Sequence, residues 1–209
     1  MLLKKQPVPG KIRHIVLLLC IVAMMCSCAS RKVFSTNYYA ENEKTLTSIE
    51  QLYKAIYAQK HFSVAFTDKS FEYISLEILT DSIKYIYEFN IKEPRLQDTL
   101  VKYGLPVKDF TDLITQMSSI HCIWINNLDY YTNNQRHSLV FMSIRHVAIH
   151  LPFTSEKYYI LTFYSQPQFF DAEGNLLAGR RLRKLRLVNG DTFRRINDKV
   201  CYTISERFR

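Results

Sequence analysis

The chain has little glycine: its 209 residues include five, at positions 10, 104, 174, 179 and 190. Chemistry that needs a glycine-rich loop around a phosphate therefore has little room. The pair Gly174 and Gly179 has the spacing of such a loop, but Arg180 and Arg181 follow where Lys and then Ser or Thr are required. The sequence thus argues against a phosphate-loop nucleotide site.

Long apolar runs are also missing. The longest one near the N-terminus, from Ile15 to Met25, follows the basic residues Lys4, Lys5, Lys11 and Arg13. A spanning helix needs about 20 apolar residues, whereas an export signal needs a basic start and about 7–15 apolar residues before small ones. The pattern therefore predicts a signal peptide, residues 1–27, and not a lasting transmembrane helix.

The signal ends at Met25-Cys26-Ser27-Cys28. A peptidase that cuts before a cysteine needs a small residue just upstream, so Cys28, which follows Ser27, is favoured over Cys26, which follows a methionine. This junction resembles the lipobox of bacterial lipoproteins, in a style similar to those of Bacteroidota, although it lacks the leucine that the strongest form has three residues before the cysteine.

The resemblance covers the signal alone. It implies diacylglycerol on Cys28, a bacterial cell-envelope location and a membrane as partner, and it implies no activity. The basic Arg31 and Lys32 that follow would favour a protein facing the periplasm. The alternative is that Cys20, Cys26 and Cys28 are small apolar residues of an ordinary signal or of an uncleaved anchor.

Length and composition predict one folded domain after the signal. Apolar residues make up 47% of the chain and aromatic residues 13%, which excludes a disordered chain. We expect a short tether over residues 28–40 and a single domain over residues 41–209, large enough to fold without a metal or a disulfide framework.

Hydrophobic spacing predicts the order of elements. A helix is expected over residues 45–59, a hairpin over 71–89, and helices over 96–103 and from Pro106 to about Met117. Further strands are expected near 121–130, 138–150, 158–170, 180–188, 191–196 and 199–207, with a tight turn at Asn189-Gly190. This order predicts an α+β fold, a mainly antiparallel curved sheet packed on one to three helices. Cystatin-like or NTF2-like cones fit the same order, but no motif favours either.

Cysteine is scarce beyond the signal, where Cys122 and Cys201 remain. Export to an oxidising compartment would allow a bridge between them, and two buried free thiols are the alternative because both lie in apolar strand patterns. The pairs Tyr38-Tyr39, Tyr130-Tyr131 and Tyr158-Tyr159 should each place one ring in the core and one outside, where exposed rings could contact a glycan.

Positive charge gathers at the C-terminus. Residues 180–209 carry ten basic and three acidic residues, whereas residues 28–179 carry 14 basic and 16 acidic. The candidate surface for an anionic partner comprises Arg180, Arg181, Arg183, Lys184, Arg186, Arg194 and Arg195. It would suit an anionic lipid, an acidic glycan or a protein. The alternative is a charged sheet edge that prevents aggregation. The export signal argues against nucleic acid.

No catalytic motif stands out, and nothing implies a cofactor or a metal. His146 and His150 would share one face of a strand about 13 Å apart, too far for one zinc ion, and His61, His121 and His137 have no companion motif. Scattered carboxylates such as Asp129 show no readable pairing. The sequence therefore favours a non-catalytic binding or adaptor module, with an envelope hydrolase or a cone-shaped small-ligand domain as the alternative.

Overall fold

The computed structural model describes residues 37–132, 135–145, 157–179 and 184–206. The chain divides into compact units at residues 1–41 and 42–209, and the description below concerns the second. Residues 37–59 are helical, so the helix expected to begin near residue 45 already includes the end of the expected tether.

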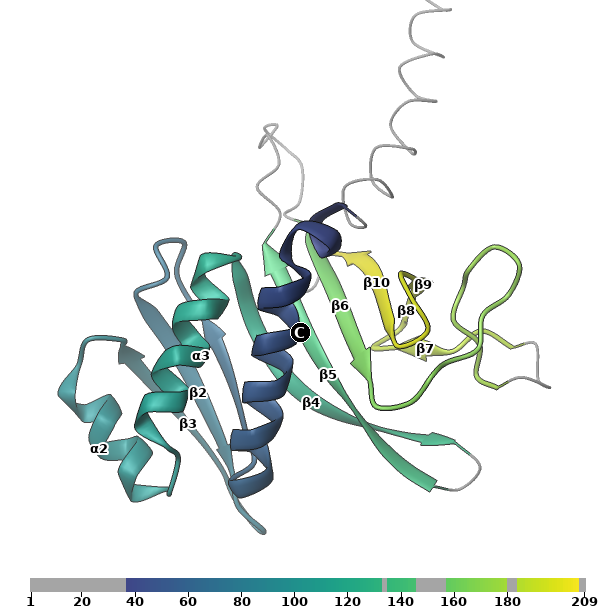
Figure 1. The fold of residues 1–209 in the computed structure, drawn as a ribbon. Helices are drawn as coiled ribbons and strands as arrows, with labels where there is room; N and C mark the ends of the chain where they lie inside the picture. The colour runs from purple at the N-terminus through teal and green to yellow at the C-terminus, as the bar shows by residue number, and fades with distance from the viewer. Residues whose placement is uncertain (1–36, 133–134, 146–156, 180–183, 207–209) are drawn as a thin grey trace, which may run out of the picture. The chain divides into compact units, whose positions relative to one another are not determined.

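The core of the fold is one antiparallel sheet of eight described strands, in the order β3-β2-β1-β4-β5-β6-β10-β9 (Figure 1). The strands are β1 (Phe62–Phe66), β2 (Tyr73–Leu79), β3 (Lys84–Asn90), β4 (Cys122–Thr132), β5 (Gln135–Arg145), β6 (Tyr158–Tyr164), β9 (Arg194–Arg195) and β10 (Val200–Ser205). The expected α+β class with a mainly antiparallel sheet is confirmed, and so is the hairpin that β2 and β3 form.

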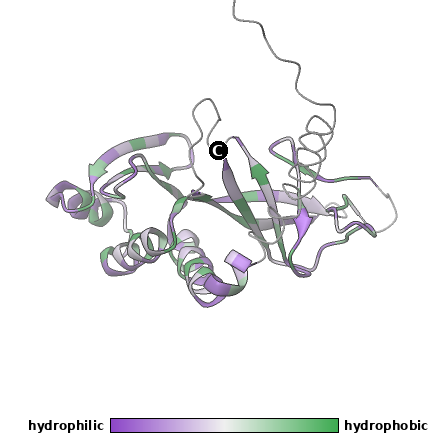
Figure 2. Ribbon diagram, turned by 90° about the horizontal axis from the view of Figure 1, so that it is seen from above, coloured by the Kyte–Doolittle hydropathy of each residue, from purple (hydrophilic) through white to green (hydrophobic). Residues whose placement is uncertain are grey.

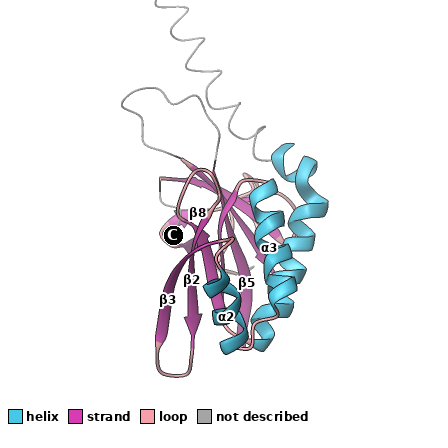
Figure 3. Ribbon diagram, turned by 90° about the vertical axis from the view of Figure 1, so that its left-hand side faces the viewer, coloured by secondary structure: helices cyan, strands magenta, loops and turns pink. Residues whose placement is uncertain are grey.

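Helices cover one face of this sheet, as Figures 1 and 3 show. Two of them are α2 (Pro94–Lys102) and α3 (Val107–Ser119), which lie between β3 and β4 in the chain. Gly104 adopts a φ of 73° just after α2, as expected of a residue that ends a helix. In α3 the predicted apolar side is buried, namely Phe110, Leu113, Ile114 and Met117.

The helix face of the sheet is closed by large side chains from the helix of residues 42–59 and from α3. Leu46, Ile49, Tyr53 and Ile56 are each 0% exposed, and Phe62 of β1 packs between Tyr53 and Phe110 at ring distances of 5.0 and 5.8 Å. Burying each such side chain contributes roughly 1.5–3 kcal/mol. Figure 2 shows hydrophobic and hydrophilic residues alternating along these helices.

A second core lies on the opposite face of the sheet, over β4, β5, β6 and β10. Here the chain after β6 folds back as a meander, and its Leu176 and Phe193 are buried against Phe141, Ile160 and Cys201. Consequently Tyr158 and Tyr159 are both buried, at 8% and 6% exposure. The expectation that one of them would be exposed is wrong, because the sheet is covered on both faces at this point.

The meander contains less regular strand than expected. The short strands β7 (Leu187–Val188) and β8 (Asp191–Thr192) pair across Asn189-Gly190, whose φ values of 51° and 85° are those of the predicted tight turn. The predicted strand over 158–170 ends at Tyr164, shortly before Pro167, and of the predicted strand over 180–188 only Leu187–Val188 is a strand among the described residues.

One irregularity sets the orientation of β4. Cys122 lies opposite Ile144 of β5, whereas Trp124 lies opposite Ser143, so the register shifts by one residue between them. Ile123 is the extra residue of a β-bulge. Beyond the bulge, Ile125, Asn127 and Asp129 face the helices, whereas Trp124 and Tyr130 belong to the meander-side core.

Candidate functional site

The outer ends of β4 and β5 form a two-stranded arm that carries a pocket on each face. Figure 1 shows the two strands continuing past the helices. We call the cavity on the helix side the helix-face pocket and the cavity on the other side the meander-face pocket. Both lie within the unit of residues 42–209.

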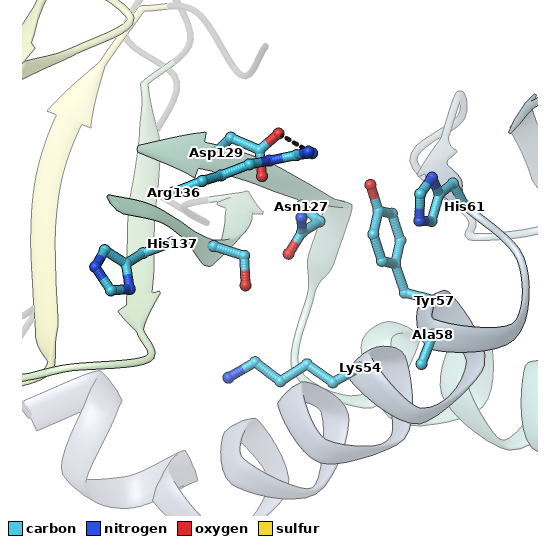
Figure 4. Close-up of a pocket in the computed structure, with 9 residues that line it drawn as sticks. Lys54, Tyr57, Ala58, His61, Asn127, Asp129, Arg136 and His137 are labelled. Atoms are coloured by element: carbon cyan, nitrogen blue, oxygen red, sulfur yellow. Dashed lines mark hydrogen bonds and ion pairs between the residues drawn. The ribbon is translucent and has the colours of Figure 1, made fainter. Parts of the chain in front are cut away.

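The helix-face pocket has a volume of about 430 Å³ (Figure 4). It lies between the end of the N-terminal helix and the arm, and it is lined by Lys54, Tyr57, Ala58, His61, Asn127, Asp129, Arg136, His137 and Ser138. The ring of His137 turns away from the cavity in Figure 4 and packs on Tyr130 at 5.4 Å. The other side chains that line the pocket are polar, except for Ala58 and the ring of Tyr57.

Charges in this pocket are partly neutralised by ion pairs. Arg136 donates to Asp129 across the two strands of the arm at 2.6 Å, and Lys54 donates to Glu50 one helical turn earlier, also at 2.6 Å. The Arg136 side chain is 65% exposed and that of Lys54 38% exposed. Both cations therefore keep donors that can reach a ligand, and Asp129 holds Arg136 at the cavity wall.

Tyr57 and His61 form an aromatic wall. Their rings are stacked at 4.5 Å and 17°. Tyr57 lies in the last turn of the helix, and His61 lies two residues after the helix ends. Burial raises the pKa of the Tyr57 phenol, and a hydrogen bond with the Asn127 side chain opposes that rise. Tyr57 is therefore a neutral hydroxyl at physiological pH, able both to donate and to accept a hydrogen bond.

The floor of the pocket is fixed by a buried tyrosine. Tyr53, one turn before Tyr57, donates its hydroxyl to the carbonyl oxygen of Phe62 at 2.6 Å, and the backbone N–H of Asn127 lies against the same hydroxyl. In the ladder between β1 and β4, Val64 pairs with Ile125 and Ala65 with Trp124. The Tyr53 hydroxyl connects the two strands just beyond the end of this ladder. Asn127 is thereby positioned by the core.

The meander-face pocket has a volume of about 360 Å³ and joins the arm to the β7–β8 turn. Arg186 lies over the ring of Tyr130 at 5.2 Å and donates to Gln168 at 2.7 Å, to Thr132 at 3.3 Å and to the Ala178 carbonyl at 2.9 Å. Three of its five donors are therefore committed to holding the meander against the arm.

A buried hydroxyl without a hydrogen bond borders this second pocket. Tyr164 is 2% exposed, and its hydroxyl has no hydrogen-bond partner in the described structure. Burial raises the pKa of the Tyr164 phenol well above its usual value, and the nearby Thr162 side chain, which lies outside good hydrogen-bond geometry, opposes part of that rise. A buried donor without a partner costs free energy, so this position is a local weakness of the meander-side core.

The predicted basic surface divides into parts with different roles. Arg180, Arg181 and Arg183, like Cys28, lie outside the described residues. Lys184 and Arg194 are exposed. Arg195 pairs with Asp198 at 2.6 Å and lies over the Phe170 ring at 5.4 Å, and Arg186 is turned inward as described.

Cys122 and Cys201 are buried free thiols. Strands β5 and β6 lie between β4 and β10, so the two cysteines are separated by three strand spacings, about 14 Å. A disulfide needs Cα atoms about 4.4–6.8 Å apart, so this fold leaves them unbridged. Burial raises the pKa of each thiol to about 12, which keeps both protonated and unreactive at neutral pH.

Sequence reasoning missed the helix-face pocket. His61, Asp129 and Arg136 carry no common motif, and the fold brings them together from three separate elements. The one available signal for the pocket was that Asn127 and Asp129 lie two residues apart in a predicted strand and so share a face. Which face they share is determined by the bulge at Ile123. The histidine pair His146 and His150 lies outside the described residues.

Comparisons give the chain no relative: no protein-family model, no curated protein and no solved structure matches it. In the described part of the chain, no three His, Cys, Asp or Glu side chains gather closely enough to hold a metal ion. No helix among the described residues has the length and hydrophobicity to cross a bilayer.

Proposed function

We propose that the chain is a lipid-anchored envelope protein and a non-catalytic binding module whose helix-face pocket takes an acidic saccharide. One observation supports the acidic saccharide as ligand. The pocket gathers three groups that can bear positive charge, Lys54, His61 and Arg136, around neutral donors and an aromatic wall. Such a lining suits a ligand that combines hydroxyl groups with a carboxylate.

Size and shape support a small ligand. A volume of about 430 Å³ lies within the range of about 300–1,000 Å³ typical of small-molecule sites. The planar fork of Arg136 can bind a carboxylate through two parallel hydrogen bonds. Asn127, Ser138 and the Tyr57 hydroxyl can serve sugar hydroxyls, and the stacked rings of Tyr57 and His61 offer an apolar edge to a sugar ring.

Binding is favoured over hydrolysis by the carboxylate chemistry of the pocket. Glycoside hydrolysis generally needs two carboxyl groups, one to donate a proton and one to act as base or nucleophile. Among the described residues that line the pocket, Asp129 is the sole carboxylate. Its carboxylate is moreover engaged by Arg136 at 2.6 Å.

The pocket can be tested with oligosaccharides that end in glucuronate, compared with the same oligosaccharides ending in glucose. We expect the acidic probe to bind more tightly, and Arg136→Ala to weaken its binding about tenfold or more, because a charge-assisted hydrogen bond contributes about 1.5–3 kcal/mol. Titration calorimetry measures both. Asp129→Asn should strengthen binding, because it releases Arg136 from its partner.

Arg194→Ala is the matched control, since Arg194 is exposed on β9 and does not line the pocket. It should leave the affinity unchanged. Equal binding of the acidic and the neutral probe, or equal effects of Arg136→Ala and Arg194→Ala, would refute an acidic-saccharide site in this pocket.

The anchor is tested separately. We expect a clickable fatty acid to label the chain in a bacterial host and Cys28→Ala to abolish the label, because the acceptor cysteine would be gone. Cys26→Ala should keep the label, since the small residue at Ser27 remains in place. Labelling and membrane fractionation that persist in Cys28→Ala would show that the anchor has been misassigned.

A second candidate function is contact of the basic meander with an anionic membrane surface. Among the described residues, Lys184 and Arg194 are exposed and form no ion pair. Each basic residue near an anionic bilayer contributes about 1 kcal/mol, so residues 184–195 would add to a lipid anchor rather than replace it.

A further inference from the structure

The two ends of the sheet differ in a way that points to a partner. At one end, β9 is a strand of two residues, Arg194 and Arg195, both exposed. Short, charged edges of this kind discourage pairing with other chains. At the other end, β3 is a seven-residue edge strand, and Figure 3 looks onto this edge.

The β3 edge is more apolar than an edge exposed to water usually is. Ile86 is 60% exposed and Tyr85 36% exposed, and Ile83, just before the strand, is 54% exposed. On the neighbouring strand, Tyr73 is 51% exposed on the same face as Ile86. The helices lie on the face of the sheet opposite to Ile86 and Tyr73. The described elements therefore leave the face that carries Ile86 and Tyr73 open.

The register identifies which backbone groups of β3 are unpaired. Thr80 donates to the Ile83 carbonyl and Ile91 donates to the Glu72 carbonyl, each at 2.9 Å. Both pairs follow the register of β2 with β3, and hydrogen-bonded pairs alternate along an antiparallel ladder. The odd-numbered residues of β3 therefore bond to β2, whereas Lys84, Ile86 and Glu88 direct their N–H and C=O groups outward.

These three residues are symmetric about Ile86 in the segment Lys84-Tyr85-Ile86-Tyr87-Glu88. A second β3, placed antiparallel with Ile86 opposite Ile86, sets Lys84 opposite Glu88 twice and Tyr85 opposite Tyr87 twice. Every outward backbone group of the three residues then has a partner. Opposite charges and aromatic pairs facing each other across strands each contribute roughly 0.2–1 kcal/mol.

We propose that two copies of this chain associate through β3, forming one continuous sheet about a two-fold axis at Ile86. The contact is self-complementary, as a two-fold interface must be. Lys84 already pairs with Glu77 at 2.7 Å, so in the dimer its ammonium lies between Glu77 and the partner's Glu88. The dimer does not depend on the helix-face pocket and would stand if that pocket bound nothing.

Disulfide trapping in the full-length chain tests this geometry. In a hydrogen-bonded antiparallel pair the Cα atoms lie about 5.5 Å apart, within the range that a disulfide spans. Ile86→Cys should therefore give a cross-linked dimer on mild oxidation, read on a non-reducing gel. Val101→Cys, 67% exposed on α2, should give at least tenfold less, and the unsubstituted chain supplies the background from the native cysteines.

A charge change supplies the second measurement. Adding Glu88→Lys to Ile86→Cys sets lysine against Lys84 at both ends of the pairing, and we expect the yield of cross-linked dimer to fall several-fold. Glu72→Lys makes the same charge change outside β3 and should leave the yield as it was. Equal yields for Ile86→Cys and Val101→Cys, an unaffected yield with Glu88→Lys, a cross-link to a different protein, or a monomer mass by light scattering would each overturn the proposal.

Discussion

Phe193→Ala is expected to lower the free energy of unfolding by about 4 kcal/mol, since truncating a buried aromatic side chain typically costs 3–5 kcal/mol. Phe193 is 1% exposed, and its ring lies 6.5 Å from that of Phe141 on β5. Its carbonyl also accepts a hydrogen bond from the Leu176 N–H at 2.8 Å. The side chain is thus a main apolar contact that holds the meander against the sheet.

Denaturant unfolding followed by circular dichroism measures this loss. Leu187→Ala provides the control, because Leu187 belongs to the same meander but is 58% exposed, and its truncation should change the stability by less than about 0.5 kcal/mol. A loss below about 1 kcal/mol for Phe193→Ala would mean that the meander is not packed on this face as described.

Tyr53→Phe is expected to cost about 2 kcal/mol although the ring stays in place. The change removes the hydroxyl that donates to the Phe62 carbonyl at 2.6 Å, at a site with 0% exposure. A buried acceptor that loses its partner costs about 1–3 kcal/mol. Because the same hydroxyl lies against the Asn127 backbone, the variant should also bind the acidic probe less tightly.

Tyr164→Phe is the matched comparison, made in the other core. It removes the same atom from the same residue type, but the Tyr164 hydroxyl has no hydrogen-bond partner in the described structure. Its removal should leave the free energy of unfolding unchanged or raise it by up to about 1 kcal/mol. If both variants lose similar stability in thermal unfolding, the two hydroxyls are not in the different environments described here.

Local patterns in the sequence predicted local structure well. The alternation around Ile83, Tyr85 and Phe89 predicted the β2–β3 hairpin, and Asn189-Gly190 predicted the β7–β8 turn, because in both cases the signal lies within a few neighbouring residues. The apolar spacing in α3 identified its buried side correctly. These features depend on backbone preference and on a single buried face.

Contacts between distant segments could not be predicted in the same way. Tyr158 and Tyr159 looked like one buried and one exposed ring because nothing in their own strand reveals that the meander covers the second face. Arg186 belongs to a basic run, yet it turns inward to Gln168, Thr132 and Tyr130. The helix-face pocket requires His61 and Arg136 to meet, and that meeting is set by the strand order, in which β1 lies beside β4.

The extra residue in β4 has a consequence for how the chain tolerates insertions and deletions. Cys122 and Ile125 face the helices, whereas Ile123 and Trp124 both lie on the meander side. Deleting Ile123 would therefore restore strict alternation and leave Asn127 and Asp129 on the helix side. Deleting Asn126 instead would turn Asn127 and Asp129 to the meander side and exchange the polar wall of one cavity for the apolar wall of the other. The bulge is thus the place where β4 can lose a residue while the chemical character of the helix-face pocket is kept.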